Sequence, residues 1–391
     1  MSRKKVNSIV FVSNYYSHHQ APLSEALFCA LGEGYHFIET EPMSEERIKL
    51  GWGEKTVPSC VVSSTEFHSN REKYETMIHD ADIVILGSAP ASLLQSRIRE
   101  RKAVFRYSER PLKEKTAKWK YPFRLITWRR LHPQRNNILM LCASAYTATD
   151  YGKFFLYKNN CYKWGYFPRV KKYDEIESLI EAKRPASIAW VARFIDWKHP
   201  EMAIEIAKRL KNDGYRFEMN MIGTGVLEDA IREKIAAENL DDCVHMLGSM
   251  KPDEVRTYME KSEIFLFTSD RNEGWGAVLN ESMNSACAVI ANHAIGSVPF
   301  LVEDEKNGLI YKDKDADALY AKTKWLLEHE SERKNMARHA YETMMAEWNA
   351  ENAAKKLLVL AEKVINGEKC VDLFENGVCS KAQILKDNWK K

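Results

Sequence analysis

The sequence predicts an α/β protein with two doubly wound domains, each built on a parallel sheet. Short apolar or β-branched runs alternate with segments of helical periodicity through both halves of the 391-residue chain. This alternation is typical of parallel strands joined by crossover helices. The length suits two domains of roughly 150 residues or a little more each. We therefore expect one such sheet in each half.

The first half contains four predicted strands and two clear helical segments. The strands are predicted at 9–12, 83–86, 103–107 and 138–142, and the helices at 22–31 and 70–79. The second half contains five predicted strands, four helices and a final short strand after the turn at Asn307-Gly308. These strands are predicted at 187–191, 217–222, 244–247, 264–268 and 289–291, and the helices at 200–210, 227–238, 252–261 and 277–285.

The domain boundary is predicted near Tyr166-Phe167-Pro168, where the apolar pattern breaks and a charged stretch follows. We expect domains at 1–168 and 169–366, with a tail at 367–391 that returns to the N-terminal domain. Residues 1–165 hold 25 Lys and Arg against 16 Asp and Glu, whereas the rest hold 33 against 39. One basic and one acidic half indicate domains with different partners.

The composition excludes several classes of protein. Its longest apolar runs are far below the ~18 residues that span a bilayer, and the basic N-terminus lacks the apolar core of a signal peptide. The eight cysteines are scattered without a C-x-x-C pair, which argues against a zinc site and a disulfide framework. We expect a cytoplasmic protein without a metal site.

Polar and glycine residues follow the strands of the second half, at the edge where open α/β sheets bind ligands. Arg193 and Lys198 follow the first strand, and two cations there can hold a diphosphate. Gly223, Gly225 and Gly248 follow the next two strands, where glycine lets a backbone approach a ligand closely. Taken alone, a surface Arg and Lys or a tight turn explains these residues equally well.

Two glutamates, Glu273 and Glu281, are separated by seven residues after the apolar strand at 264–268. Among 55 acidic residues in 391, roughly eight such pairs arise by chance. The position after a strand, the flanking glycines and the upstream cations make this pair more specific. Backbone amides at the start of the following helix form a ready phosphate site.

In this order and spacing, residues 187–312 resemble the donor domain of family-4 retaining glycosyltransferases, which have the GT-B fold of two Rossmann-like domains facing across a cleft. The matching pieces are Arg193 with Lys198, Ile222-Gly-Thr-Gly225, Val244-His-Met-Leu-Gly248, Glu273-Gly-Trp-Gly276 with Glu281, and Asn307-Gly308-Leu309. The chain departs from the family pattern at Ala286, Ala288 and Phe300, where the family often has glycine, proline and glutamate.

The resemblance implies a role for each matched residue. Arg193 and Lys198 would hold the donor diphosphate, and Glu273 would contact the donor sugar. Glu281 would take the ribose hydroxyls, while the backbone around Gly276 and Ala277 would support the phosphates. The resemblance also implies retention at the anomeric carbon, no metal or other cofactor, and a nucleotide-diphosphate sugar, expected to be a UDP-sugar, as co-substrate. The C-terminal domain would bind this donor and the N-terminal domain the acceptor.

The first half matches the family less specifically, through Val10-Phe-Val-Ser-Asn14. His18 and His19 in the following loop, and Glu109 after a later strand, are candidates for contact with the acceptor or donor. A surface histidine, or a carboxylate paired with a neighbouring arginine, is the alternative for each.

Residues 110–135 interleave basic and aromatic side chains. This pattern fits an anionic membrane surface, where each basic residue contributes ~1 kcal/mol, and it fits a solvated helix equally well. The members are Arg110, Lys113, Lys115, Lys118, Trp119, Lys120, Tyr121, Phe123, Arg124, Trp128, Arg129, Arg130 and Arg135. Membrane contact at the inner face would suit a lipid-linked or saccharide acceptor for a surface polysaccharide. No motif supports nucleic-acid binding.

Two other functions remain open for this sequence. A sugar-nucleotide epimerase of the same fold would share the nucleotide site and form no glycoside. A non-catalytic partner subunit would keep the fold without using a nucleotide sugar.

Overall fold

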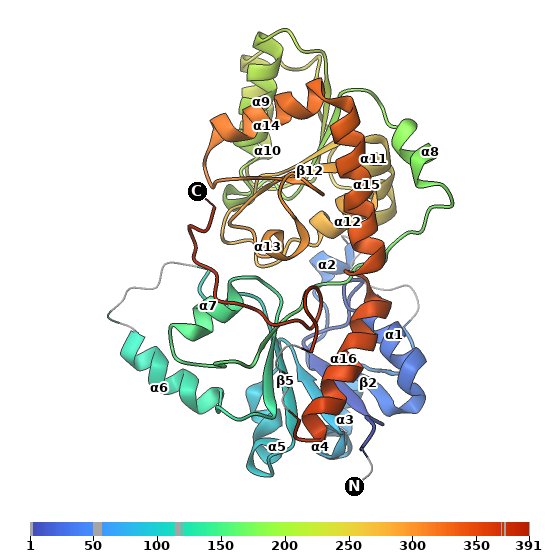
Figure 1. Ribbon diagram of the computed structural model, residues 1–391, viewed down its shortest axis with the longest axis vertical. Coiled ribbons are helices and arrows are strands. Elements are labelled where there is room, and N and C mark those ends of the chain that lie inside the picture. Colours follow the sequence, from blue (N-terminus) through green and yellow to red (C-terminus); the bar gives the residue numbers. More distant parts are fainter. Residues whose placement is uncertain are drawn as a thin grey trace. The chain divides into compact units, whose positions relative to one another are not determined.

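The computed structural model describes residues 3–49, 57–113, 119, 121–368, 370 and 373–390. The chain forms two compact units (Figure 1). Unit 1 comprises Met1–Arg169 with Glu347–Lys386, and unit 2 comprises Val170–Ala346 with Asp387–Lys391. Each unit contains one sheet, and every strand pair in both sheets is parallel.

Unit 1 is a seven-stranded sheet with the order β3-β2-β1-β4-β5-β6-β7. Its strands are β1 (Ile9–Ser13), β2 (Tyr35–Glu39), β3 (Val61–Val62), β4 (Ile83–Leu86), β5 (Ala103–Ser108), β6 (Ile138–Cys142) and β7 (Cys161–Lys163). Its helices are α1 (Ala21–Leu31), α2 (Glu45–Lys49), α3 (Ser64–Ser69), α4 (Arg71–Asp80), α5 (Gln95–Arg99), α6 (Tyr121–Leu131), α7 (Thr147–Gly152) and α16 (Ala350–Ile365). The four predicted strands are confirmed. We did not predict β2, β3 and β7, because β2 mixes polar with apolar residues and the other two are very short.

Unit 2 is a six-stranded sheet with the order β10-β9-β8-β11-β12-β13, which is the Rossmann order. Its strands are β8 (Ser187–Val191), β9 (Glu218–Ile222), β10 (Val244–Met246), β11 (Ile264–Phe267), β12 (Ala288–Asn292) and β13 (Leu309–Tyr311). Its helices are α8 (Ile176–Glu181), α9 (Pro200–Asn212), α10 (Glu228–Ala237), α11 (Pro252–Lys261), α12 (Val278–Asn284), α13 (Val298–Leu301), α14 (Ala316–Glu328) and α15 (Glu330–Ala346). Every strand and helix predicted for this half is confirmed to within two residues at each end.

The chain divides differently from the expected boundary at residue 366. Helix α16 belongs to unit 1, where it packs against α1 (Figure 1). Its apolar residues recur every three or four positions and are buried, among them Ala353, Leu357, Leu360 and Val364. This periodicity predicts a helix that covers a sheet, but it does not say which of two sheets is covered.

The C-terminal segment continues on both units. Tyr162 and Lys381 form an antiparallel bridge in unit 1, where Thr149 Oγ also donates to the carbonyl of Leu385 at 2.7 Å. The last residues belong to unit 2, where His293 Nε2 lies 3.0 Å from the carbonyl oxygen of Asp387.

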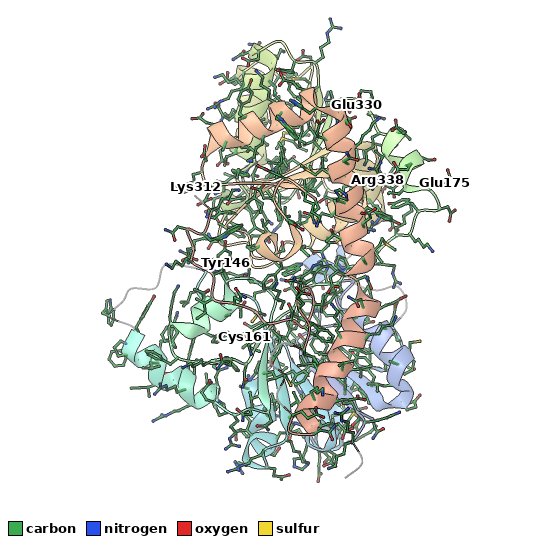
Figure 2. All side chains as sticks on the ribbon, viewed as in Figure 1. Tyr146, Cys161, Glu175, Lys312, Glu330 and Arg338 are labelled. Atoms are coloured by element: carbon green, nitrogen blue, oxygen red, sulfur yellow. The ribbon has the colours of Figure 1, made fainter. Side chains whose placement is uncertain are left out.

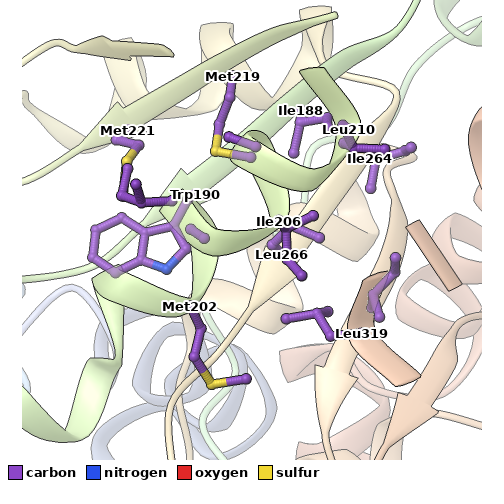
Figure 3. Close-up of a cluster of buried hydrophobic side chains, with 14 of the residues drawn as sticks. Ile188, Trp190, Met202, Ile206, Leu210, Met219, Met221, Ile264, Leu266 and Leu319 are labelled. Atoms are coloured by element: carbon purple, nitrogen blue, oxygen red, sulfur yellow. The ribbon is translucent and has the colours of Figure 1, made fainter. Parts of the chain in front are cut away.

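A dense apolar core supports the sheet of unit 2 (Figure 3). Helices α9 and α14 place Ile206, Leu210 and Leu319 against strand side chains that include Ile188 and Trp190. The indole N–H of Trp190 donates to Thr268 Oγ1 at 2.8 Å, directly after β11. The core therefore determines where the loops after β8 and β11 begin.

On the surface of unit 2, α8 packs against α15. Arg338 of α15 forms an ion pair with Glu177 of α8, near the labelled Glu175 that precedes α8 (Figure 2). Such an exposed pair adds at most ~1 kcal/mol, so apolar packing accounts for most of the stability here. No helix among the described residues is both long and apolar enough to cross a membrane.

Candidate functional site

The strand order of unit 2 reverses between β8 and β11, and loops at such a reversal form the ligand-binding edge of doubly wound sheets. The loop after β8 carries Arg193 and Lys198, and the loop after β11 carries Glu273. Hydrogen bonds to backbone carbonyls of the loop after β8 join the two loops. Thr268 Oγ1 donates to the carbonyl of Lys198 at 2.6 Å, and the Asp270 amide donates to the carbonyl of Trp197 at 2.9 Å.

The structure brings Lys198 and Glu273 into an ion pair. Lys198 Nζ contacts Glu273 Oε2, and each side chain is largely buried, with 13% and 14% of its surface exposed. Burial makes this pair sensitive to the loss of either partner, because an unpaired buried charge is costly. The cation expected to hold phosphate thus already contacts the carboxylate expected to hold sugar.

Arg193 has a different environment. Its side chain is exposed, and its guanidinium carbon lies 5.7 Å from the ring centre of Trp197. Within the described part of the chain, no carboxylate forms an ion pair with Arg193. Arg193 therefore offers five N–H donors to an anionic ligand without first breaking an ion pair.

The glycines after β9 serve the chain's own backbone. A Cβ built on Gly223 would lie 1.9 Å from the carbonyl oxygen of Ala192, and one built on Gly225 would lie 2.4 Å from that of Phe194. The loop after β9 thus packs directly on the backbone that flanks Arg193. Gly248 has φ +73° and no heavy atom within 4 Å of an added Cβ, so it faces open space. We expected these glycines to let the backbone approach a ligand closely. At Gly223 and Gly225 the backbone instead approaches the neighbouring loop.

Glu281 lies in the first turn of α12, the helix that follows the loop carrying Glu273. Burial raises the pKa of the Glu281 carboxyl, and no described side chain or amide donates a hydrogen bond to it. The N–H groups of Gly276 and Ala277 likewise donate to nothing in the described residues. A carboxylate acceptor and two backbone donors are thus available to a ligand at the start of α12.

His199, which we did not identify from the sequence, also lies at this edge of the sheet. His199 follows Lys198 in a left-handed conformation, with φ +50°, and begins α9. Its Nε2 lies 3.5 Å from Asp270 Oδ2 and its Nδ1 2.7 Å from Glu201 Oε1. These two carboxylates raise the pKa of His199 to about 9, so the ring carries a positive charge at neutral pH. The sequence signal that could have identified His199 was its position between Lys198 and the proline that begins α9.

Unit 1 brings its three predicted candidates into one cluster. The rings of His18 and His19 lie 3.8 Å apart, and the His19 ring stacks on Tyr166 at 5.7 Å. The Tyr166 hydroxyl donates to Glu109 Oε1 at 2.7 Å. Burial, with a smaller contribution from His18, lowers the pKa of His19 to about 3, so that ring is neutral. We did not identify Tyr166 from the sequence, although it lies in the predicted boundary segment.

The neighbouring cations are arranged differently from the sequence expectation. Glu109 pairs with Lys113 at 2.6 Å, not with an arginine. Arg110 is 2% exposed and lies 3.3 Å from the buried Asp150, so it is not part of a surface patch. The predicted surface members Lys115, Lys118 and Lys120 lie outside the described residues.

Comparison with known proteins finds similarity in the part of the chain that contains these loops. Residues 172–343 match the family model described as glycosyl transferases group 1. The chain is 30% identical, over 46% of each sequence, to the amylovoran biosynthesis glycosyltransferase AmsK of Erwinia amylovora. It is 31% identical, over 37% of this chain and 38% of the relative, to a Campylobacter jejuni N-acetylgalactosaminyltransferase whose name includes a diphospho-undecaprenol substrate. The matched segments therefore span about half or less of these relatives.

Most of the chain has the fold of a solved structure. The crystal structure of Anabaena HepE in complex with UDP superposes with a TM-score of 0.67 at 13% identity, covering 90% of this chain and 98% of that one. Both units thus belong to one GT-B architecture. Residues 172–343, which contain the loops after β8 and β11, are therefore the part of the chain that is similar to the glycosyl transferases group 1 family.

Proposed function

We propose that the chain is a retaining glycosyltransferase that moves a sugar from a UDP-sugar to a hydroxyl of a saccharide or lipid-linked acceptor, in the synthesis of a surface polysaccharide. The observation that carries the proposal is the Lys198–Glu273 ion pair, which joins the loops after β8 and β11 where the sheet of unit 2 reverses its order. The named relatives and the UDP complex of HepE support the reaction class and the nucleotide.

In this proposal the donor loses the bond between its anomeric carbon and the diphosphate oxygen. Negative charge grows on the departing phosphate. The exposed Arg193 guanidinium and the backbone N–H groups of Gly276 and Ala277 are already in place and stabilise that charge electrostatically. The acceptor oxygen bonds to the anomeric carbon on the face that the phosphate leaves, and its proton passes to a phosphate oxygen. No covalent enzyme intermediate is required.

The Lys198–Glu273 pair gives the donor sugar a prepared contact. Glu273 can accept from sugar hydroxyls while Lys198 keeps its carboxylate ionised and oriented, and Lys198 can also reach a phosphate oxygen. Glu281, which has no donor in the described residues, accepts from the ribose hydroxyls. Under this proposal unit 2 binds the donor, and the His18, His19 and Glu109 cluster of unit 1 contributes to the acceptor site.

The first test is thermal unfolding of the purified chain, without added metal, in the presence of UDP, GDP, ADP and their common sugar conjugates. We expect UDP and a UDP-sugar to raise the midpoint, because a ligand that binds only the folded state stabilises it. The shift should be lost in Arg193→Ala and kept in Arg232→Ala, an exposed arginine on α10. No shift with any nucleotide would favour the non-catalytic partner subunit.

Product analysis tests the reaction class. Arg193→Ala, Lys198→Ala and Glu273→Ala should each lower turnover by roughly a hundredfold or more, whereas Lys208→Ala, which removes an ion pair with Glu238 away from these loops, should not. A glycoside with the donor's anomeric configuration is the expected product. A new sugar nucleotide without glycoside would identify the epimerase instead, and wild-type turnover in one variant would remove the role of that residue.

We further propose that the chain meets its acceptor at the inner face of a membrane, through the basic stretch 110–135. The Campylobacter relative, whose name includes a polyprenyl diphosphate, supports a lipid-linked acceptor. Nucleic acid is not among the partners proposed.

A further inference from the structure

The α6 surface, defined here as Phe123, Ile126, Arg129, Arg130 and Phe155, combines exposed apolar and cationic side chains. No residue of α6 is buried. Phe123 is 68% exposed, Ile126 57% and Phe155 71%. Half of the large apolar side chains that are exposed in the described residues lie between 119 and 155. Such clustering marks an interaction site, because exposed apolar residues are otherwise scattered singly.

The opposite side of α6 attaches it to unit 1. Trp128 packs against Phe154 and Tyr151, with ring centres 4.7 and 5.2 Å apart. Tyr121 also packs against Phe154, at 5.2 Å. Because residues three and seven apart share a helix face, Phe123, Ile126 and Arg130 project together from the side that these contacts leave open. Figure 1 shows α6 at the margin of unit 1.

Phe155 adds an exposed aromatic side chain in the segment against which α6 packs. It follows Phe154, which packs beneath α6, and it adopts φ +58°. A bulky side chain in this conformation is uncommon and costs about 1–2 kcal/mol. The fold therefore holds an aromatic ring in solvent at a conformational cost, which packing within unit 1 does not explain.

The charge around this surface has a single sign. From residue 115 to residue 149 the sequence contains no Asp or Glu and seven Lys or Arg. Arg129 and Arg130 are exposed, and neither forms an ion pair within the described residues. Apolar side chains flanked by unpaired arginines are complementary to anionic headgroups above an acyl layer. An acid-free surface of this kind offers a protein partner no acceptor for its own cations.

We propose that the α6 surface inserts Phe123, Ile126 and Phe155 into the headgroup–acyl boundary of an anionic bilayer, with Arg129 and Arg130 on lipid phosphates. This deepens the membrane contact proposed above and rests on it only for its biological setting. The insertion of apolar side chains, and not charge alone, is the new element. It implies that binding survives salt concentrations that screen surface charges.

The test is cosedimentation of the full chain with vesicles of phosphatidylcholine, with and without phosphatidylglycerol, at low and high salt. We expect binding to the anionic vesicles that weakens but persists at high salt. Phe123→Ser with Ile126→Ser should weaken it by about tenfold or more. Arg129→Gln with Arg130→Gln should remove the preference for phosphatidylglycerol. The matched controls are Val226→Ser, 87% exposed in unit 2, and Arg99→Gln with Arg101→Gln.

Four results would overturn the proposal. Wild-type affinity in the Phe123→Ser, Ile126→Ser variant, or complete loss of wild-type binding at high salt, would leave only electrostatic attachment. Equal loss in the Val226→Ser control would show nonspecific adhesion. Binding to neither vesicle, with capture of a protein or nucleic acid instead, would assign the surface to another partner.

Nucleotide stabilisation, measured on the same proteins, separates this inference from the proposed reaction. The substituted side chains are exposed, so the unfolding midpoint and the UDP shift should both stay at wild-type values. Vesicle binding without any nucleotide shift would refute the glycosyltransferase proposal and leave the α6 surface standing. The reverse result would refute the α6 surface alone.

Discussion

Replacing Gly223 with alanine tests whether the loop after β9 sets the position of Arg193. The added Cβ would lie 1.9 Å from the carbonyl oxygen and 2.9 Å from the carbonyl carbon of Ala192, and φ is +140°. Relief requires a shift of roughly 1 Å in the backbone that enters Arg193, because neither atom belongs to a flexible side chain. Overpacking and backbone strain of this kind cost about 2–4 kcal/mol. For a domain of this size the midpoint should fall by roughly 4–15 °C.

Gly214→Ala is the matched control, because Gly214 lies between α9 and β9, outside the proposed donor site. Gly214 also has positive φ, at +81°, but no heavy atom lies within 4 Å of the added Cβ. Its cost is then the left-handed conformation alone, about 1–2 kcal/mol. Differential scanning calorimetry of the full chain, with and without UDP, measures both effects and can resolve two units that unfold separately. We expect Gly223→Ala to lose most of the UDP shift and Gly214→Ala to keep it. Equal destabilisation, or a wild-type UDP shift in Gly223→Ala, would refute the reasoning.

Three further predictions concern the surrounding structure. The carboxylates of Asp270 and Glu201 raise the pKa of His199 to about 9, above its ordinary value of 6.5. The charged ring therefore contributes about 1–2 kcal/mol to the free energy of unfolding, which is complete below pH 6.5 and lost as pH rises to 9. His199→Gln should flatten that part of a stability-versus-pH curve, and an unchanged slope would contradict it. Arg97→Met should cost about 3–5 kcal/mol, since the buried guanidinium donates to five backbone carbonyls, and chemical unfolding should show a far smaller effect for the exposed Arg99→Met. Asn284→Ala removes the amide that bonds both N–H and C=O of Lys171, so proteolysis after Arg169 or Lys171 should accelerate, and an unchanged rate would argue against this anchor.

The sequence predicted the donor half in detail because its signals are local. Each strand of unit 2 is a short apolar run, and the residues that follow it necessarily lie at one edge of a parallel sheet. Strand-end position alone therefore predicts that Arg193, Lys198, Glu273 and Glu281 gather at one edge. The same logic predicted β1, β4, β5 and β6 of unit 1, but not β2, which mixes polar with apolar residues.

The acceptor half was less predictable because its signals depend on distant contacts. His19 and Glu109 follow different strands, and Tyr166, which follows a third, links them by a stacked ring and a hydrogen bond. Arg110 stands among surface cations in the sequence, yet it pairs with Asp150 in the core. A side chain's sequence neighbours do not reveal such partners.

By itself, the sequence determined two doubly wound sheets, their strands and helices, and the family resemblance of the second half, since periodicity and strand-end motifs depend on neighbouring residues. Only the tertiary structure decided that α16 packs in unit 1 against α1, that Lys198 pairs with Glu273, that His199 is charged between two carboxylates, and that Gly223 and Gly225 make room for the backbone around Arg193. Each of these depends on which surfaces meet after the chain folds. An amphipathic helix, a lone cation or a glycine is compatible with many tertiary contacts, and the packing of the folded chain selects one of them.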